Sequence, residues 1–126
     1  MPHEDGSAYW PCVATVSLAG SVVLDIYGKN ADGSVSRTPR WRILQEPGSL
    51  LVTTGDVYVG TLHGIADVEV DEDLGPETVA NWNLLGNRGA VEREGGRNHR
   101  ITRTSLTFRD VLKVSNAGAR ILGARK

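Results

Sequence analysis

Apolar and polar residues alternate with a period close to two along most of the chain, which predicts strands rather than helices. We expect strands at residues 12–18, 21–27, 40–44, 49–54 and 100–111. Ala19-Gly20 marks one turn, and Glu46-Pro47-Gly48 is expected to join the third and fourth strands as a hairpin. Short strands at intervals of about 8–12 residues are typical of an all-β sandwich or barrel.

The remaining segments predict loops and a tail rather than long helices. Residues 75–98 are rich in glycine and asparagine, and we expect a long loop there. Residues 114–126 are small and basic, which predicts a frayed tail. The chain of 126 residues is long enough for one domain. We expect a core at residues 1–113, with the loop as an insertion at about 75–98, and a basic C-terminal tail.

The formal charge of −1 favours neither a nucleic acid nor a membrane surface as a partner. The charges are unevenly distributed, however. Residues 1–80 hold four basic and twelve acidic side chains, whereas residues 81–126 hold ten basic and three acidic ones. Either the second part has an unevenly charged solvated surface, or it presents a basic face to an anionic ligand or a nucleic acid.

The single cysteine, Cys12, excludes an internal disulfide and a zinc site built from several cysteines. No apolar run approaches the ~18 residues of a membrane span. The first residues carry two acids and do not resemble a signal peptide. We therefore expect an intracellular protein of a reducing compartment, with no membrane partner.

His3 and Asp5 are separated by one residue, so both side chains point to the same side of an extended segment. An imidazole nitrogen and a carboxylate oxygen suit a divalent metal of intermediate hardness. If His63 joins them from a neighbouring strand, the set becomes two histidines and one carboxylate, as in non-haem Fe(II) oxygenases. The alternative is a solvated pair near the N-terminus and a histidine packed in the core.

Arg103 and Arg109 are six residues apart on the last expected strand. A period of two places them on one face together with Ser105 and Thr107. Two guanidinium groups and two hydroxyls suit a small dicarboxylate, because arginine binds carboxylates bidentately. The alternative is a strand face exposed to solvent.

Taken in order, His3-x-Asp5, His63 and Arg103-x5-Arg109 resemble the Fe(II)- and 2-oxoglutarate-dependent dioxygenases of the AlkB type. The strand with two arginines is the specific part of this resemblance. Residues 1–6, 50–52 and 62–65 are most similar to the AlkB homolog 6 branch of the family. The resemblance covers about residues 1–113.

The resemblance implies a double-stranded β-helix, or jelly roll, with His3, Asp5 and His63 as the catalytic iron ligands. It also implies oxidative demethylation of an N-methylated nucleic acid, RNA or DNA, in the cytoplasm or the nucleus. Fe(II) would be the cofactor, with 2-oxoglutarate and O2 as co-substrates.

By the same resemblance, Arg103 corresponds to the arginine that clamps the distal carboxylate of 2-oxoglutarate. Arg109 corresponds to a second arginine, near the inner carboxylate and the substrate. Ser105 and Thr107 share this 2-oxoglutarate-binding face.

The chain departs from the family at its beginning. Family members have an Asn-x-Tyr element before the His-x-Asp motif, whereas only two residues precede His3 here. We therefore expect the C-terminal part of a longer protein, with a jelly roll that is incomplete on its N-terminal side and folds weakly alone. Two other functions stay open: an inactive remnant or binding module that retains the metal site, and an oxygenase acting on a protein or another methylated substrate.

Overall fold

The computed structural model describes residues 1–6 and 8–113, and the expected tail at 114–126 lies outside the described residues. Its elements in chain order are β1 (Tyr9–Ala19), β2 (Val22–Gly28), β3 (Trp41–Gln45), β4 (Leu50–Thr54), α1 (Gly55–Gly60), β5 (Thr61–Gly64), β6 (Val70–Asp71), η1 (Trp82–Leu84), α2 (Arg88–Arg93), β7 (Asn98–His99) and β8 (Thr104–Val111). No helix in this part of the chain has the length and hydropathy that crossing a bilayer requires.

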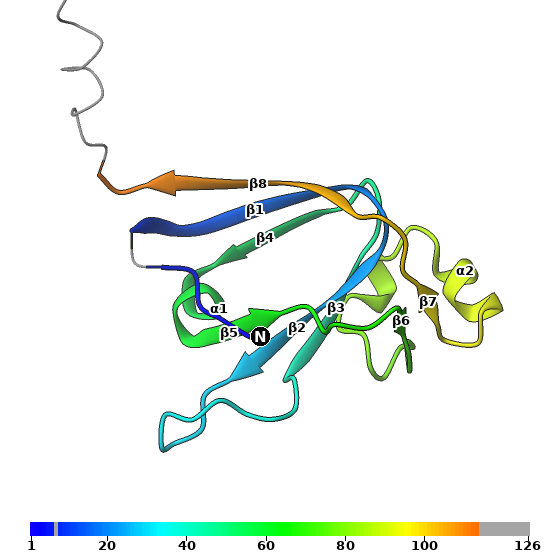
Figure 1. The fold of residues 1–126 in the computed structure, drawn as a ribbon, viewed down its shortest axis with the longest axis horizontal. Helices are drawn as coiled ribbons and strands as arrows, with labels where there is room; N and C mark the ends of the chain where they lie inside the picture. Colours follow the sequence, from blue (N-terminus) through cyan, green and yellow to red (C-terminus); the bar gives the residue numbers. More distant parts are fainter. Residues whose placement is uncertain (7, 114–126) are drawn as a thin grey trace, which may run out of the picture.

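Two antiparallel sheets form the body of the molecule, with strand orders β4-β1-β8 and β3-β2-β5. Figure 1 shows that the sheets face each other, converge where β1 runs into β2, and diverge towards the opposite end. The N-terminal segment lies beside β5 at the wide end (Figure 1). The all-β jelly-roll fold expected from the sequence is confirmed.

The predicted hairpin between the third and fourth strands is wrong. β3 pairs with β2, and β4 pairs with β1 in the other sheet. The turn between them takes the chain from one sheet to the other, because it bonds to Ser17 of β1. The Gly48 amide donates to the Ser17 carbonyl (2.8 Å), and the Ser17 amide donates to the Ser49 carbonyl (2.9 Å). The strand expected over 100–111 begins later, at Thr104, so Arg103 lies immediately before β8.

The buried core lies on the outer face of the β3-β2-β5 sheet. Val23 and Leu44, opposite each other on β2 and β3, pack with side chains of the segment that follows β6. That segment includes residues 75–98, which were expected to be a loop. It contains η1 and α2, and it contributes Trp82 and Val91 to the core. Burial of these large apolar side chains holds the segment in place.

The β4-β1-β8 sheet turns its apolar side outwards. Leu50, Val52, Leu106 and Phe108 are each about half exposed on its outer face, at 63%, 50%, 49% and 57%. Because side chains alternate along a strand, Ser105, Thr107 and Arg109 on β8 point into the space between the sheets. This arrangement places polar side chains, beside apolar ones such as Val13 and Ile26, in the interior between the sheets.

Candidate metal centre

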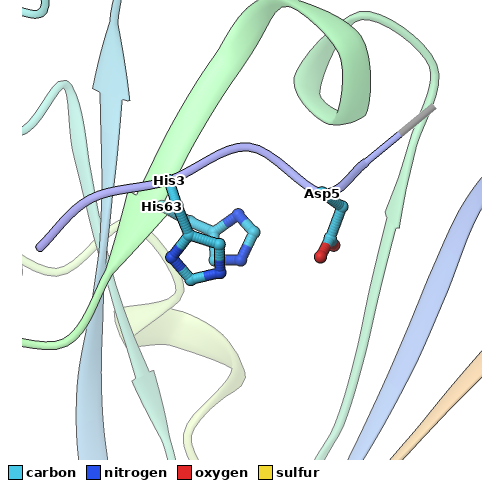
Figure 2. Close-up of side chains that lie close together, drawn as sticks. All are labelled: His3, Asp5 and His63. Atoms are coloured by element: carbon cyan, nitrogen blue, oxygen red, sulfur yellow. The ribbon is translucent and has the colours of Figure 1, made fainter.

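Three side chains with metal-binding groups meet at the wide end of the space between the sheets. One ligand atom each of His3, Asp5 and His63 lies within 4.8 Å of the others. The two imidazole rings are 4.5 Å apart between centroids. Figure 2 shows the imidazoles next to each other, with His3 and Asp5 pointing to the same side of the N-terminal segment. The structure therefore brings together the three ligands expected from the sequence.

A short backbone pairing places His3 opposite His63. The His3 amide donates to the His63 carbonyl and the His63 amide donates to the His3 carbonyl, both at 2.9 Å. The next residue on β5 is Gly64, where a Cβ atom would lie 3.1 Å from Pro2 Cα. A side chain at this position would push the N-terminal segment away, so the glycine permits the close approach that the site needs.

Asp5 is fixed from the opposite sheet by Arg109. The Arg109 Nη2 atom donates to Asp5 Oδ1 at 3.0 Å, and the Asp5 side chain is only 11% exposed. The guanidinium of Arg109 also lies over the ring of Tyr9, 5.6 Å from its centroid. This ion pair compensates the carboxylate charge and orients Asp5 towards the histidines.

His63 is prepared to act as a neutral ligand. Burial lowers the pKa of His63, and the electrostatic influence of His3 and Arg109 lowers it further, although Asp5 acts in the opposite direction. An imidazole must be deprotonated at the nitrogen that binds a metal. The surroundings therefore favour the protonation state that ligation requires.

The donor set fits a divalent ion of intermediate hardness. Two imidazoles and one carboxylate form the two-histidine, one-carboxylate arrangement typical of Fe(II) sites with open coordination positions. A closed structural zinc site would need a fourth protein ligand, and among the described residues the cluster contains three.

The three side chains open into a cavity of about 390 Å³ between the sheets. The other residues expected to form the site also line this cavity, namely Arg103, Ser105, Thr107 and Arg109. A larger hollow of about 630 Å³ lies beside α2 and contains none of the expected site residues.

Arg103 is held in the cavity by neutral partners. Its Nη1 atom donates to Ser105 Oγ at 2.6 Å, and its Nη2 atom donates to Gln45 Oε1 at 2.6 Å and to Ser17 Oγ at 3.1 Å. The Nε atom is buried without a hydrogen-bond partner in the described structure. Burial lowers the pKa of Arg103, and no carboxylate opposes that effect. An arginine stays charged all the same, and among the described residues the Arg103 guanidinium pairs with no carboxylate.

The turn between β1 and β2 determines where Arg103 lies. Gly20 has a φ of +67°, and a Cβ atom there would lie 2.7 Å from the Thr102 carbonyl oxygen and 3.0 Å from Arg103 Cα. Only glycine accepts both this backbone conformation and this contact. The chain therefore crosses directly over the turn before it enters β8.

Sequence reasoning missed Ser17 and Gln45, the two partners of Arg103 on other strands. Their side chains are almost fully buried, with exposed fractions of 0% and 4%. Each is a polar side chain buried at an inward position of its strand. That signal could have marked them as partners of a buried charge, since buried polar groups are nearly always hydrogen-bonded.

The sequence of the chain is similar to that of a known protein. The chain is 37% identical over 123 residues to a protein of Danio rerio named "Probable RNA/DNA demethylase ALKBH6". The chain is AlkB-like. The aligned region includes 93% of this chain, and the chain spans about half the length of that AlkB-like relative. No protein-family model matches the chain.

Proposed function

We propose that this AlkB-like chain carries the catalytic centre of an Fe(II)- and 2-oxoglutarate-dependent dioxygenase that demethylates N-methylated nucleic acid. One observation carries the proposal: a cluster of two histidines and a carboxylate shares a cavity with an arginine that pairs with no carboxylate in the described part of the chain. A metal and a carboxylate ligand are what these two groups would bind.

Each residue of the cavity has a distinct part in this proposal. His3, Asp5 and His63 would hold the iron, which would supply the activation of O2. Arg103 receives the distal carboxylate of 2-oxoglutarate, and the hydroxyls of Ser105 and Thr107 add donors on the same face. Arg109 keeps Asp5 oriented and lies on the substrate side.

The reaction balances with two co-substrates. One oxygen atom of O2 enters the product of 2-oxoglutarate, which loses CO2 and becomes succinate. The other enters the N-methyl group, and the resulting hydroxymethyl amine releases formaldehyde and leaves N–H. The protein contributes position and the exclusion of water rather than a reacting side chain.

The nucleic-acid substrate is supported by the name of the relative and by the charge distribution. The relative is named as an RNA/DNA demethylase. Ten of the fourteen lysines and arginines lie in residues 81–126, and basic side chains provide the phosphate contacts of nucleic-acid-binding proteins. A location in the cytoplasm or the nucleus is part of the same proposal.

The test measures co-substrate binding and turnover separately. Anaerobic titration with Fe(II) and 2-oxoglutarate is expected to produce the visible charge-transfer band of the joint complex. N-methylated RNA and DNA oligonucleotides in air are then expected to yield succinate and formaldehyde, and His63→Ala is expected to abolish both. Binding without turnover would indicate a binding module, and turnover on a methylated peptide alone would indicate a protein substrate. Either result would contradict the proposal.

A further inference from the structure

Gln45 lies at the end of β3 with 4% of its surface exposed, and its side-chain oxygen is the meeting point of the contacts around Arg103. Gln45 Oε1 accepts from Arg103 Nη2 at 2.6 Å and from Ser17 Oγ at 3.4 Å. The backbone of Gln45 is fixed opposite Val22 in the sheet. The amide oxygen therefore occupies a defined position beside the guanidinium.

The chemistry of this acceptor matters because it is neutral. A carboxylate in the same place would form a charge-assisted bond with Arg103 and neutralise it. An apolar side chain would leave the Nη2 donor with only the Ser17 hydroxyl. An amide oxygen fixes the orientation of the guanidinium and leaves its charge available to a ligand.

The next residue, Glu46, is an acid, but its carboxylate points away from Arg103. Side chains alternate along a strand, and the carboxylate of Glu46 accepts from the backbone amides of Gly86 and Asn87 at 2.7 and 3.0 Å. The acid thus holds the segment before α2, outside the cavity, while the amide faces Arg103.

We propose that Gln45 is a positioning residue, which holds the Arg103 guanidinium towards the cavity while leaving its charge uncompensated, so that the site selects ligands with a terminal carboxylate. This inference rests on the proposed function and adds to it the group that sets the affinity for the co-substrate. Gln45 acts through Arg103 and touches none of the reacting atoms.

The decisive variant is Gln45→Glu, which changes the charge and almost nothing of the shape. We expect the affinity for 2-oxoglutarate, measured by anaerobic calorimetry with Mn²⁺ in place of iron, to fall by about tenfold or more, because the new carboxylate competes for the guanidinium. Mn²⁺ affinity without 2-oxoglutarate should stay unchanged. In turnover, the KM for 2-oxoglutarate should rise by a similar factor with little change in kcat.

Two further variants separate this role from a structural one. Gln45→Met removes the acceptor without adding charge, and we expect it to weaken 2-oxoglutarate binding less than Gln45→Glu does. Asn30→Asp adds the same charge on an exposed loop, and we expect wild-type binding. A Gln45→Glu protein that melts at or above the wild-type temperature excludes unfolding as the cause, since the buried arginine has gained a partner.

The outcomes distinguish this inference from the proposed function. Wild-type affinity for 2-oxoglutarate in a folded Gln45→Glu protein overturns the role of Gln45 alone. Equal losses in Gln45→Met and Gln45→Glu would also overturn it, because charge would then be irrelevant. A wild-type protein that binds 2-oxoglutarate but releases no formaldehyde overturns only the proposed function, and one that binds no dicarboxylate overturns both.

Discussion

Arg100 and Arg103 are three residues apart, yet the structure uses them in opposite ways. Arg100 donates to both carboxylate oxygens of Asp71, at 3.1 and 2.6 Å, and the Asp71 side chain is only 3% exposed. Asn98 donates to the same carboxylate at 2.8 Å. Arg103 instead meets an amide and two hydroxyls.

This difference distinguishes an arginine that stabilises the fold, Arg100, from one whose charge is available to a ligand, Arg103. The Arg100–Asp71 pair is complete within the chain and fastens β6 and β7 together. Arg103 is fixed as firmly in direction, but its charge is balanced by nothing in the described protein. The identity of the acceptors, rather than the burial of the arginine, therefore distinguishes a structural guanidinium from a binding one.

The largest effect is expected from removing Arg100, which tests whether its pair with Asp71 stabilises the fold. Arg100→Met would leave the buried Asp71 carboxylate with Asn98 as its remaining side-chain donor, and we expect the free energy of unfolding to fall by about 3–5 kcal/mol. Urea denaturation followed by tryptophan fluorescence measures this. As a control, Arg97→Met breaks an exposed pair with Glu72 and should cost about 0–1 kcal/mol. Equal stability of the two variants would contradict the structural role of Arg100.

Removing Arg103 should have the opposite signature. Arg103→Met should weaken 2-oxoglutarate binding by about 10- to 150-fold, as expected for the loss of one charge-assisted hydrogen bond worth about 1.5–3 kcal/mol. Stability should stay near that of the wild type, because Ser17 still bonds to Gln45 and a buried charge has gone. Calorimetry and urea denaturation of the same samples check both halves. Loss of stability without loss of binding would reverse the assignment.

The metal site should also respond to pH through His63. The folded-state pKa of His63 is lowered, so the stability derived from its neutral form is present above about pH 6.5 and is lost as the pH falls. Metal binding also needs neutral imidazoles. We expect the Mn²⁺ affinity to drop by up to about tenfold per pH unit below the pKa of a single histidine, as measured by calorimetry from pH 7.5 to 5.5. An affinity independent of pH would exclude His63 as a ligand.

Arg109 should show the smallest effect, because its pair with Asp5 is intermediate between the other two arginines. The Arg109 side chain is 33% exposed, and we expect Arg109→Gln to weaken Mn²⁺ binding by about two- to fivefold. Lys29→Gln breaks an ion pair to the neighbouring Glu4 and should leave Mn²⁺ binding unchanged. Equal effects of the two substitutions would show that Arg109 does not orient the carboxylate.

The sequence predicted the parts of this molecule that depend on local pattern. Period-two alternation located β1 to β4, and the same rule directed Arg103 and Arg109 to one side, where both line the cavity, although Arg103 lies just before β8. His3, Asp5 and His63 could be joined because family resemblance supplied the long-range link. Neither spacing nor composition brings residue 3 to residue 63.

Other features depend on tertiary contacts that no local rule contains. The turn at Glu46-Pro47-Gly48 has ordinary hairpin chemistry, but the backbone of Ser17 captures it and directs β4 into the other sheet. Residues 75–98 contain the glycines of a loop, yet Trp82 finds an apolar surface on β2 and β3 and orders the segment. The sequence around Gln45 indicates only the end of a strand. Its role depends on a hydrogen bond from Arg103, which is 58 residues away in the sequence.

The meeting of His3 and His63 has a consequence beyond chemistry. Residues 1–6 are joined to β5 by one reciprocal pair of backbone hydrogen bonds, and this segment carries two of the three candidate ligands. An ion bound there would cross-link His3 and Asp5 to His63. It would close a loop of about sixty residues and hold residues 1–6 against β5. Chelation should then be visible without any enzyme assay, as faster cleavage of the segment around His3 in limited proteolysis.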